Sequence, residues 1–566
     1  MTNGIFYPFT CIFYSNIGVS KKTAGGTAGI EKPGFSPPNK ILYLTGSISF
    51  IGVLVKTFGS AVYGIEAITI TIEVNISGAS KPFYLIVGLP DNAVRESMQR
   101  VEAALQTNNF RMPRQKIIVN MAPADIRKEG SAYDLPIALG ILASSSQIDR
   151  EPLEKYIIMG ELSLDGSLQP IKGALPIAIQ ARKDGFKGFI LPKQNAREAA
   201  IVNDLEVYGV ETISEVADFF NGKTQLTAEI VNTREEFYKS LTSYDSDFSE
   251  VRGQENIKRA LEIAAAGGHN VILIGPPGAG KTMLARRLPS ILPPLSLHES
   301  LETTKIHSVA GKLAAADALV TTRPFRSPHH TISDVALVGG GSNPQPGEIS
   351  LAHNGVLFLD ELPEFKRTAL EVMRQPLEER RVTISRAKFS VDYPSSFMLV
   401  ASMNPCPCGY FNHPEKECVC PPGTVQKYLS KISGPLLDRI DLHVEVTPVN
   451  FTELASDRLA EKSELIRERV IKARDIQALR FGDKPNLYAN AQMSPQMVRD
   501  ICKITPAGQS LLKKAMEKLG LSARAYDRIL KVARTIADLA GSEEIQLEHL
   551  AEAIHFRSLD REGWAG

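Results

Sequence analysis

The chain has 566 residues, of which 43% are hydrophobic and 22% charged, and its formal net charge is +1. This composition is ordinary for globular domains and excludes a collagenous, wholly disordered or strongly basic chain. Six cysteines in so long a chain exclude a disulfide scaffold, and a length of about 150 residues per domain predicts three or four domains.

The first 53 residues differ in composition from the rest. They contain a tract rich in Gly, Pro and Lys, "SKKTAGGTAGIEKPGFSPPNK", whose lack of periodicity is typical of disorder. An apolar run follows over 41–55, but it is shorter than the ~20 residues that span a bilayer. We therefore expect residues 1–53 to be a disordered or non-native extension. No other run suits a membrane span, so we expect a cytoplasmic protein.

Residues 54–222 predict a mixed α/β domain. Apolar–polar alternation over 55–76 and the runs "FYLIVGLP" and "KIIVNMAP" indicate strands. Asp91 is placed to cap an amphipathic helix, and "YDLPIALGILASS" is typical of a buried helix. An Asp-Gly pair in "YIIMGELSLDGSLQPI" marks a hairpin. The polar stretch 223–250 that follows is expected to be a linker.

An apolar strand, a Gly-rich loop and a helix follow in "NVILIGPPGAGKTMLARRL", which contains the pattern G-x-x-x-x-G-K-[ST]. Glycines let backbone N–H groups curl around phosphate oxygens, and the helix N-terminus adds its dipole. Lys281 is expected to reach the β- and γ-phosphates, and Thr282 to bind Mg²⁺. A Gly-rich turn without a ligand is the alternative, but the strand and helix contexts favour phosphate binding. The expected nucleotide-binding residues are Gly275, Pro276, Pro277, Gly278, Ala279, Gly280, Lys281 and Thr282.

Two further apolar strands end in polar residues. The first, in "NGVLFLDELPEF", ends at Asp360 and Glu361, and parallel sheets place ligands at such carboxyl ends. Asp360 is expected to hold Mg²⁺, and Glu361 to polarise the attacking water. An acidic turn is the competing explanation, which the phosphate loop disfavours. The second strand, in "FMLVASMNP", ends at Asn404, whose side chain can hydrogen-bond the attacking water or the γ-phosphate.

Over 54–560 the sequence resembles the magnesium-chelatase-like AAA+ ATPases of the bacterial YifB/ComM type. The most specific stretches are "PFRSPHHTISDVALVGGGSNPQPGEISLAHNGVLFLDELPEF", "VMRQPLEERRVTISRAKFSVDYPSSFMLVASMNPCPCG" and "ISGPLLDRIDLHVEV". The resemblance implies an α/β fold with three parts: an N-terminal Lon-protease-like domain over 54–222, a AAA+ core with a chelatase-type insert over 251–450, and a helical lid over 451–566. It also implies ATP and Mg²⁺ as ligands, a hexameric ring, and Asn404 as the first sensor.

The resemblance assigns two arginines to the nucleotide site. Arg439 in "GPLLDRID" matches the arginine finger, which acts on ATP bound by the neighbouring subunit. The alternative role for Arg439 is a surface ion pair with Asp438 or Asp441. Arg524 in "LSARAYDRIL" matches the second sensor on the lid, and Arg528, one turn further on, competes for that role.

The stretch "RRVTISRAKFSVDY" alternates like a β-hairpin. Its cations are Arg380, Arg381, Arg386 and Lys388. In a ring, Arg386 and Lys388 are expected to contact the DNA backbone without reading its sequence. A solvated edge hairpin is the alternative. In the chelatase-type insert, a Gly-rich segment suits a pore loop, and His329 and His330 are expected to pack or hydrogen-bond rather than bind a metal.

Four cysteines lie close together after Asn404: Cys406, Cys408, Cys418 and Cys420. Four thiolates complete a tetrahedral Zn²⁺ site, although the single residue within each pair is a tighter spacing than usual. His413 is a substitute ligand, and four reduced thiols in a loop are the alternative. A disulfide is disfavoured in a reducing compartment. We favour a structural zinc site that ties down the segment between Asn404 and Arg439.

The serine–lysine dyad of Lon proteases falls on other residues in the Lon-like domain. Lon's serine lies in Lys-Asp-Gly-Pro-Ser-Ala-Gly, and the matching position here is Ala132, with Ser131 one residue earlier. Lon's lysine follows Gly-Gly-Leu, and the matching position is Leu175, with Lys172 nearby. We expect this domain to bind a partner or to scaffold the ring.

The resemblance favours an ATP-driven ring motor that acts on DNA, similar to the branch-migration helicases of the ComM type. A chelatase-type remodeller, which reshapes a partner that inserts Mg²⁺ into a porphyrin, is the first alternative. An ATP-dependent protease that uses Ser131 and Lys172 is the second. The expected partners are ATP, DNA and further copies of the chain, and no membrane.

Overall fold

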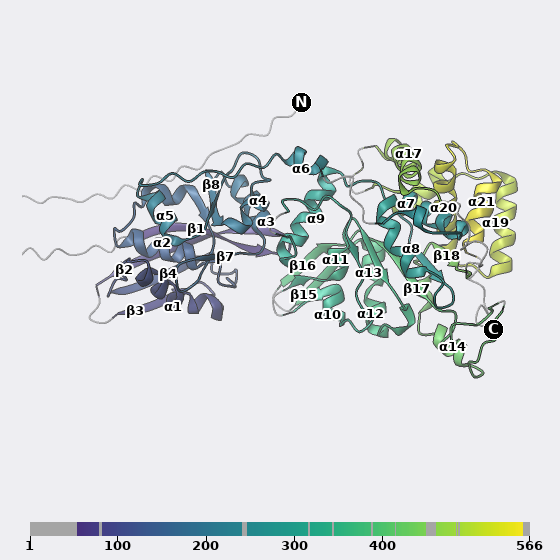
Figure 1. The fold of residues 1–566 in the computed structure, drawn as a ribbon, viewed down its shortest axis with the longest axis horizontal. Coiled ribbons are helices and arrows are strands. Elements are labelled where there is room, and N and C mark those ends of the chain that lie inside the picture. The colour runs from purple at the N-terminus through teal and green to yellow at the C-terminus, as the bar shows by residue number, and fades with distance from the viewer. Residues whose placement is uncertain are drawn as a thin grey trace, which may run out of the picture. The chain divides into compact units, whose positions relative to one another are not determined.

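The ribbon in Figure 1 is a computed structural model of the chain. The residues that it describes are 54–78, 82–239, 246–314, 317–341, 344–386, 389–413, 415–448, 460–482, 484 and 487–557. The expected extension over 1–53 lies outside them. None of the helices in these ranges is long and apolar enough to cross a membrane.

A seven-stranded sheet forms the centre of the N-terminal domain. The alternating stretch over 55–76 folds into two antiparallel strands, in which Leu54 lies opposite Asn75 and Tyr63 opposite Glu66. Beyond this pair, the strands toward one edge are all parallel to β1. In sheet order the strands are β3 (Phe83–Val87), β4 (Lys116–Ala122), β2 (Glu66–Ser77), β1 (Leu54–Tyr63), β5 (Tyr156–Ile158), β8 (Gly188–Pro192) and β9 (Glu206–Val210).

Five helices pack on this sheet, and the first two are those that the sequence predicts. They are α1 (Asn92–Thr107), α2 (Asp134–Ser144), α3 (Ala174–Lys183), α4 (Lys193–Ala199) and α5 (Ile213–Phe220). Asp91 caps α1, because its carboxylate accepts a hydrogen bond from the N–H of Val94 at 2.8 Å. Every residue of α2 is buried, which explains why its sequence is almost wholly apolar.

Two predictions for this region need adjustment. The Asp-Gly hairpin is confined to β6 (Glu161–Leu162) and β7 (Leu168–Gln169), because β5 pairs in the large sheet instead. The expected linker contains α6 (Thr233–Lys239) and the 3₁₀ helix η2 (Phe248–Glu250). Val231, Phe237 and Phe248 are buried, so apolar side chains anchor the parts of this polar stretch that the structure describes.

The central sheet is parallel throughout, with the order β11-β14-β17-β10-β18. Its strands are β10 (Val271–Ile274), β11 (Phe325–Arg326), β14 (Val356–Leu359), β17 (Met398–Met403) and β18 (Leu442–Glu445). Alternate residues enter different cores: Val271 and Leu273 face one cluster, and Ile272 and Ile274 the other. Burial on both faces explains the continuous apolar runs that mark these strands in the sequence.

The remaining elements of this region surround the sheet. They are α7 (Glu255–Gly267), α8 (Lys281–Arg287), α9 (Leu297–Ala310), α10 (Asp334–Val338), α11 (Glu348–Leu351), α12 (Arg367–Val372), α13 (Arg374–Glu379), α14 (Thr424–Leu429), α15 (Gly434–Leu437), and the strand pairs β12 (Gly339–Gly340) with β13 (Gln345–Pro346) and β15 (Arg381–Arg386) with β16 (Phe389–Pro394). The antiparallel pairing of β15 with β16 agrees with the hairpin predicted from sequence alternation.

The C-terminal region is helical, as predicted, and shares a core with the central sheet. Its helices are α17 (Ser463–Phe481), α18 (Pro495–Ile501), α19 (Pro506–Leu519), α20 (Ala523–Leu539) and α21 (Leu547–His555). Ser494, Thr505 and Ser522 cap three of them by accepting backbone N–H groups. Residues of α17 and α20 join the same apolar cluster as α7 and the sheet, so the lid is packed onto the core.

Candidate active site

The phosphate loop connects β10 to α8 at the middle of the central sheet. Gly278 and Gly280 have φ values of 78° and 82°, a left-handed conformation that glycine adopts without strain. The N–H of Gly275 donates to the carbonyl of Met403 on the neighbouring strand at 3.2 Å. The loop is therefore fixed at the strand end while its glycines leave backbone N–H groups free to turn toward an anion.

Lys281 lies at the end of this loop, and its ammonium group is surrounded by oxygen atoms. Its ammonium donates to the carbonyls of Gly275 and Pro276 at 2.7 and 2.9 Å and to Oδ1 of Asn404 at 3.1 Å, and the residue is 8% exposed. Burial lowers the pKa of Lys281, and the charges of Asp360 and Glu361 oppose this shift. A buried ammonium whose hydrogen bonds go to neutral oxygens suits a phosphate group, whose negative charge would oppose the lowering of this pKa.

Thr282 and Asp360 form a pair of hard oxygen donors beside Lys281. The Thr282 hydroxyl donates to Oδ2 of Asp360 at 2.7 Å. The other carboxylate oxygen accepts the hydroxyl of Ser402 and the N–H of Glu361. Hydroxyl and carboxylate oxygens are the ligands that Mg²⁺ prefers, together with water and phosphate, so these residues fit the ion that the sequence predicts. Ser402, which orients Asp360, carries no recognisable signal in the sequence.

Glu361 follows Asp360 at the end of β14 in a left-handed conformation, with φ of 54°. Its side chain is 57% exposed, and its Oε2 lies 3.5 Å from Nδ1 of His330. His330 therefore faces the predicted water-polarising carboxylate and can orient it through a hydrogen bond. The sequence favoured a packing or hydrogen-bonding role for this histidine but gave no signal for the partner, because the contact joins two loops far apart in the chain.

Asn404 reaches the site because β17 lies between β14 and β10. This strand order brings the ends of three strands together, and with them Asp360, Asn404 and the phosphate loop. Gln254, which the sequence did not single out, lies next to the same loop. Its Nε2 donates to the carbonyl of Ala279 at 2.7 Å, while its Oε1 is buried without a hydrogen-bond partner among the described residues.

Arg439 is held away from the phosphate loop of its own chain. It is 7% exposed, donates to the carbonyl of Pro435, and forms an ion pair with Glu378 at 2.6 Å. Neither predicted alternative partner, Asp438 or Asp441, forms this ion pair. Its Nε is buried without a hydrogen-bond partner in the described part of the chain.

The two second-sensor candidates lie in different surroundings. Arg528 donates to the carboxylate of Asp441 and, at 3.2 Å, to the carbonyl of Arg439. Burial opposes ionisation of Asp441, but Arg528 and His269 outweigh it and lower the pKa of Asp441 far below its usual range. Arg524 is exposed in the first turn of α20. The structure thus brings Arg528, not Arg524, next to the predicted finger.

The four cysteines converge as the zinc prediction requires. The ligand atoms of Cys406, Cys408, Cys418 and Cys420 all lie within 4.8 Å of one another. Cys406 is buried, and its Sγ lies 3.3 Å from that of Cys408 and 3.7 Å from that of Cys418. All four are free cysteines. Nδ1 of His413 accepts the N–H groups of Glu415 and Lys416, so this nitrogen is occupied within its own turn.

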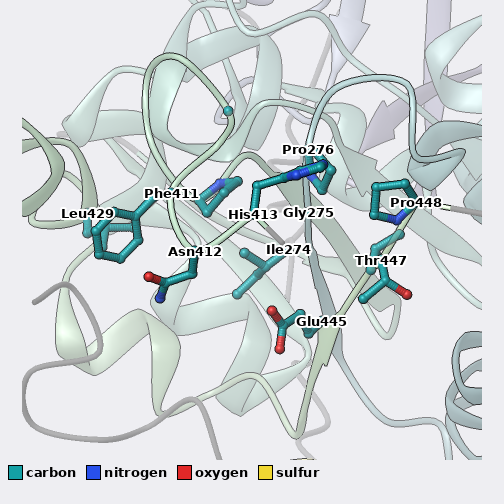
Figure 2. A pocket seen from close by; sticks show the side chains of 13 residues that line it. Ile274, Gly275, Pro276, Phe411, Asn412, His413, Leu429, Glu445, Thr447 and Pro448 are labelled. Atoms are coloured by element: carbon teal, nitrogen blue, oxygen red, sulfur yellow. The ribbon is translucent and has the colours of Figure 1, made fainter. Parts of the chain in front are cut away.

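The cysteine segment packs against the phosphate loop. Figure 2 shows Phe411, Asn412 and His413 around a small cavity that Gly275 and Pro276 also line. Its volume is about 60 Å³. A Cβ on Gly409 would lie 2.5 Å from Cδ of Pro277. The closeness of these two backbones means that the cysteine segment supports one side of the nucleotide site.

The other predicted site residues are not brought together. Ser131 donates to Glu161, Leu175 is fully buried, and among the described residues no hydrogen bond joins Ser131 to Lys172. The side chain of Arg386, at the end of β15, and the whole of Lys388 lie outside the described residues. Their contact with DNA therefore stays a prediction, as do the roles assigned to the residues above.

Sheet order, phosphate loop and paired carboxylates define a P-loop ATPase, and comparisons with known proteins identify its class. The family model described as "Magnesium chelatase, subunit ChlI" matches residues 247–454, and "Magnesium chelatase, subunit ChlI C-terminal" matches 460–557. A third, "Subunit ChlI of Mg-chelatase", matches 72–195 in the N-terminal domain. The chain therefore has the AAA+ magnesium-chelatase-like core that the sequence predicted.

Two relatives match along nearly their whole length. The chain is 45% identical to the competence protein ComM of Haemophilus influenzae over 90% of this chain and 98% of ComM. It is 42% identical to the protein YifB of Escherichia coli over 88% of this chain and 96% of YifB. The chain belongs to the ComM/YifB family of magnesium-chelatase-like AAA+ proteins. Membership of this class implies ATPase activity with ATP and Mg²⁺.

The N-terminal domain has a second relationship. Lon protease 2 of Bacillus subtilis is 34% identical over 153 residues, which cover 25% of this chain and 27% of the protease. The Lon-like character predicted from the sequence is therefore confirmed.

Proposed function

We propose that the chain is a subunit of an ATP-driven ring motor that acts on DNA and promotes branch migration. The observation that carries this proposal is the 45% identity to a competence protein across almost the whole of both chains. Competence is the uptake of DNA, so a protein of the same class that aligns with almost the whole of ComM is expected to work on a DNA substrate. The nucleotide site supports the motor part of the proposal.

Each residue of the site has a chemical role in ATP hydrolysis. Lys281 and the backbone of the phosphate loop bind the phosphates, and Thr282 and Asp360 would hold Mg²⁺, which supplies positive charge at the phosphate oxygens. Glu361 accepts a hydrogen bond from the attacking water and takes its proton. Asn404, which also accepts a hydrogen bond from Lys281, positions that water against the γ-phosphate.

Arg439 is proposed to act on the nucleotide of a neighbouring copy of the chain. Its ion pair with Glu378 holds it apart from its own phosphate loop, which supports an action in trans. A cation at that position stabilises the charge that develops on the γ-phosphate. This role requires a closed ring, and the hexamer that the family resemblance implies satisfies it.

We also propose that the four cysteines hold a structural Zn²⁺. A set of four sulfurs with no open position is the donor set of a structural zinc site, and its soft ligands disfavour Mg²⁺ or Ca²⁺. The convergence of the four Sγ atoms supports this proposal. The ion would stabilise a segment that has little regular secondary structure between β17 and α14.

A chelatase-type remodeller is the second candidate function. The matches to chelatase subunit families favour it. However, the chelatase subunit ChlI of Cyanidium caldarium is 24% identical over only 49% of this chain, although this covers 79% of that subunit. The alignment with ComM covers 90% of this chain, which is far more than this alignment covers, and this favours the motor.

The proposal is tested by strand displacement on a branched DNA substrate. We expect ATP-dependent conversion of a four-way or forked DNA into its separated arms, and no conversion with Glu361→Gln. Conversion by wild type that is equally fast without ATP, or no conversion at any protein concentration that saturates the DNA, would refute the motor.

A further inference from the structure

A large cavity lies beside Arg439, between the central sheet region and the helical lid. Its volume is about 1180 Å³, and it is lined by residues of both regions. Glu378, the ion-pair partner of Arg439, and Asp441 both line it. No residue of the phosphate loop is among the described residues that form its wall. The cavity thus belongs to the finger side of the subunit and not to its own nucleotide site.

Several cations in the wall are already neutralised or used structurally. Arg528 is paired with Asp441, and Arg323 is paired with Glu299 at 3.1 Å. Arg474 donates to the carbonyl of Ala265 at 3.0 Å, near the C-terminal end of α7, where a cation satisfies the terminal carbonyls of the helix. Arg528 and Arg323 are thus paired with carboxylates, whereas Arg474, whose pKa burial lowers to about 9, is held by two carbonyl oxygens of its own.

Arg380 and Lys531 are different. Their polar contacts converge on one neutral atom, the carbonyl oxygen of Ala491, at 3.5 and 3.1 Å. Within the described part of the chain neither forms an ion pair with a carboxylate. Burial lowers the pKa of Arg380 to about 10 and also lowers that of Lys531, while nearby Asp441 opposes both shifts. Two half-buried cations that share one carbonyl repel each other, and an anion between them would relieve this repulsion.

The backbone directs Arg380 into the cavity and away from the hairpin. Sequence reasoning placed Arg380 with the hairpin cations. The structure instead makes it the residue that ends α13, in a left-handed conformation with φ of 56°. Arg381, the next residue, begins β15 and pairs with Glu379 at 3.3 Å. Arg380 therefore lines the cavity, whereas Arg381 belongs to the hairpin.

We propose that Arg380 and Lys531 bind phosphate oxygens of the ATP held by the neighbouring subunit, and so form a second cationic contact beside Arg439. This inference rests on the proposed ring. The ligand class is a nucleoside triphosphate, presented across the subunit contact with its phosphates toward the cavity. Glu378, Arg380 and Lys531 line the same cavity, so a phosphate that enters it and draws Arg439 from Glu378 would share that space with the Arg380–Lys531 pair.

Mixed rings test whether the pair acts in trans. Arg380→Gln with Lys531→Gln should lower ATPase activity by roughly 10²-fold, because preorganised charge at the γ-phosphate is lost, while binding of a fluorescent ATP analogue persists. Lys281→Ala should be inactive through lost binding. When the two variants are mixed in equal amounts, about a quarter of the interfaces combine an intact phosphate loop with an intact pair, and activity should return to a similar fraction of wild type.

The controls separate this inference from the ring on which it rests. Arg381→Gln should leave basal ATPase unchanged. Arg439→Ala mixed with Lys281→Ala tests the finger alone. If that mixture recovers activity and the Arg380/Lys531 mixture does not, the inference is overturned and the ring stands. If neither recovers while wild type is active, the ring itself fails. Should the double variant misfold, the single variants Arg380→Gln and Lys531→Gln replace it, and each should lower ATPase activity, whereas Arg380→Lys with Lys531→Arg, which keeps both charges, should retain most of it. Folded single variants with wild-type ATPase activity would overturn the inference.

A free anion is the other source of the same ligand chemistry. Isothermal titration of Lys281→Ala protein with pyrophosphate addresses it, because this variant cannot use the phosphate loop. We expect no binding that depends on Arg380 and Lys531. Binding that disappears when both are also changed to Gln would assign the pair to a free polyphosphate and overturn the trans contact.

Discussion

At the scale of single residues, hydrogen bonds within the protein hold the side chains of the nucleotide site in place. Lys281 is buried among carbonyl oxygens, and Thr282 already contacts Asp360. These contacts hold both side chains beside the loop that is expected to bind the phosphates. Lys281, Thr282 and Asp360 are expected to bind ATP and Mg²⁺, whereas Glu361 is expected to act only on the attacking water.

Glu361→Gln should separate binding from hydrolysis. Asp360, Thr282 and Lys281 remain intact in this variant, so ATP affinity should stay within about threefold of wild type, while turnover should fall by about 10²- to 10³-fold because the base is lost. Lys281→Ala is the matched comparison, and it should lose binding itself. Fluorescent-nucleotide titration and steady-state phosphate release measure the two quantities. A Glu361→Gln protein that hydrolyses ATP at the wild-type rate would show that another group polarises the water.

Gly409→Ala should weaken ATP binding from outside the phosphate loop. The new Cβ would meet Pro277 at 2.5 Å, and φ at this position is 85°. We expect about tenfold lower affinity, which corresponds to ~1.4 kcal/mol. Gly423→Ala is the control, because its φ is 77° but nothing lies within 4 Å of its Cβ. Equal ATP affinities for the two variants would mean that the contact between the cysteine segment and the loop has no effect on the nucleotide.

At the scale of elements, the sequence predicted where the strands of the central sheet end, but it did not predict the side-chain contacts made near those ends. Apolar runs that stop at Asp360 and Asn404 predicted the convergence at the sheet edge, because parallel strands share a carboxyl edge. The contact between His330 and Glu361, and that between Arg439 and Glu378, join segments with no pattern in common. Arg380 was misassigned to the hairpin, since alternation cannot show that this residue is itself left-handed and ends α13 just before β15.

The cysteine segment should contain about one Zn²⁺ per chain. Replacing Cys406 and Cys418 by Ser removes two of four ligands and should abolish the metal, measured by elemental analysis of protein purified without chelator. Loss of the ion should also lower the melting temperature of the protein by several degrees, because the ion would hold in place a segment that packs against the phosphate loop. Cys502→Ser, a buried cysteine outside the cluster, controls for loss of a thiol. Freshly prepared wild-type protein without metal would leave four reduced thiols as the correct description.

The β15–β16 hairpin should carry the DNA contact. Changing Arg386 and Lys388 to Glu replaces two attractive charges by two repulsive ones, so stimulation of ATPase by DNA should be lost while basal ATPase and assembly persist. In wild type, each phosphate contact should add about one unit to the slope of log affinity against log salt. Undiminished stimulation in the double variant would place the DNA contact on another element.

At the scale of the whole molecule, one chain combines a Lon-like α/β domain, a AAA+ core and a helical lid that shares the core's hydrophobic cluster. The lid helices α17 and α20 pack against α7 within this cluster. We propose that this arrangement converts ATP hydrolysis into movement. The central claim is that the substrate of this movement is DNA.

The most direct test is the steady-state ATPase rate of the full chain with and without forked DNA, at low salt and saturating Mg²⁺ and ATP. The account predicts stimulation of at least several-fold by forked DNA, which declines as salt is raised because phosphate contacts are weakened. Glu361→Gln should show no stimulated rate. An active wild-type ATPase whose rate is the same with and without forked DNA, and which shows no DNA binding at low salt, would contradict the DNA motor and favour the chelatase-type remodeller.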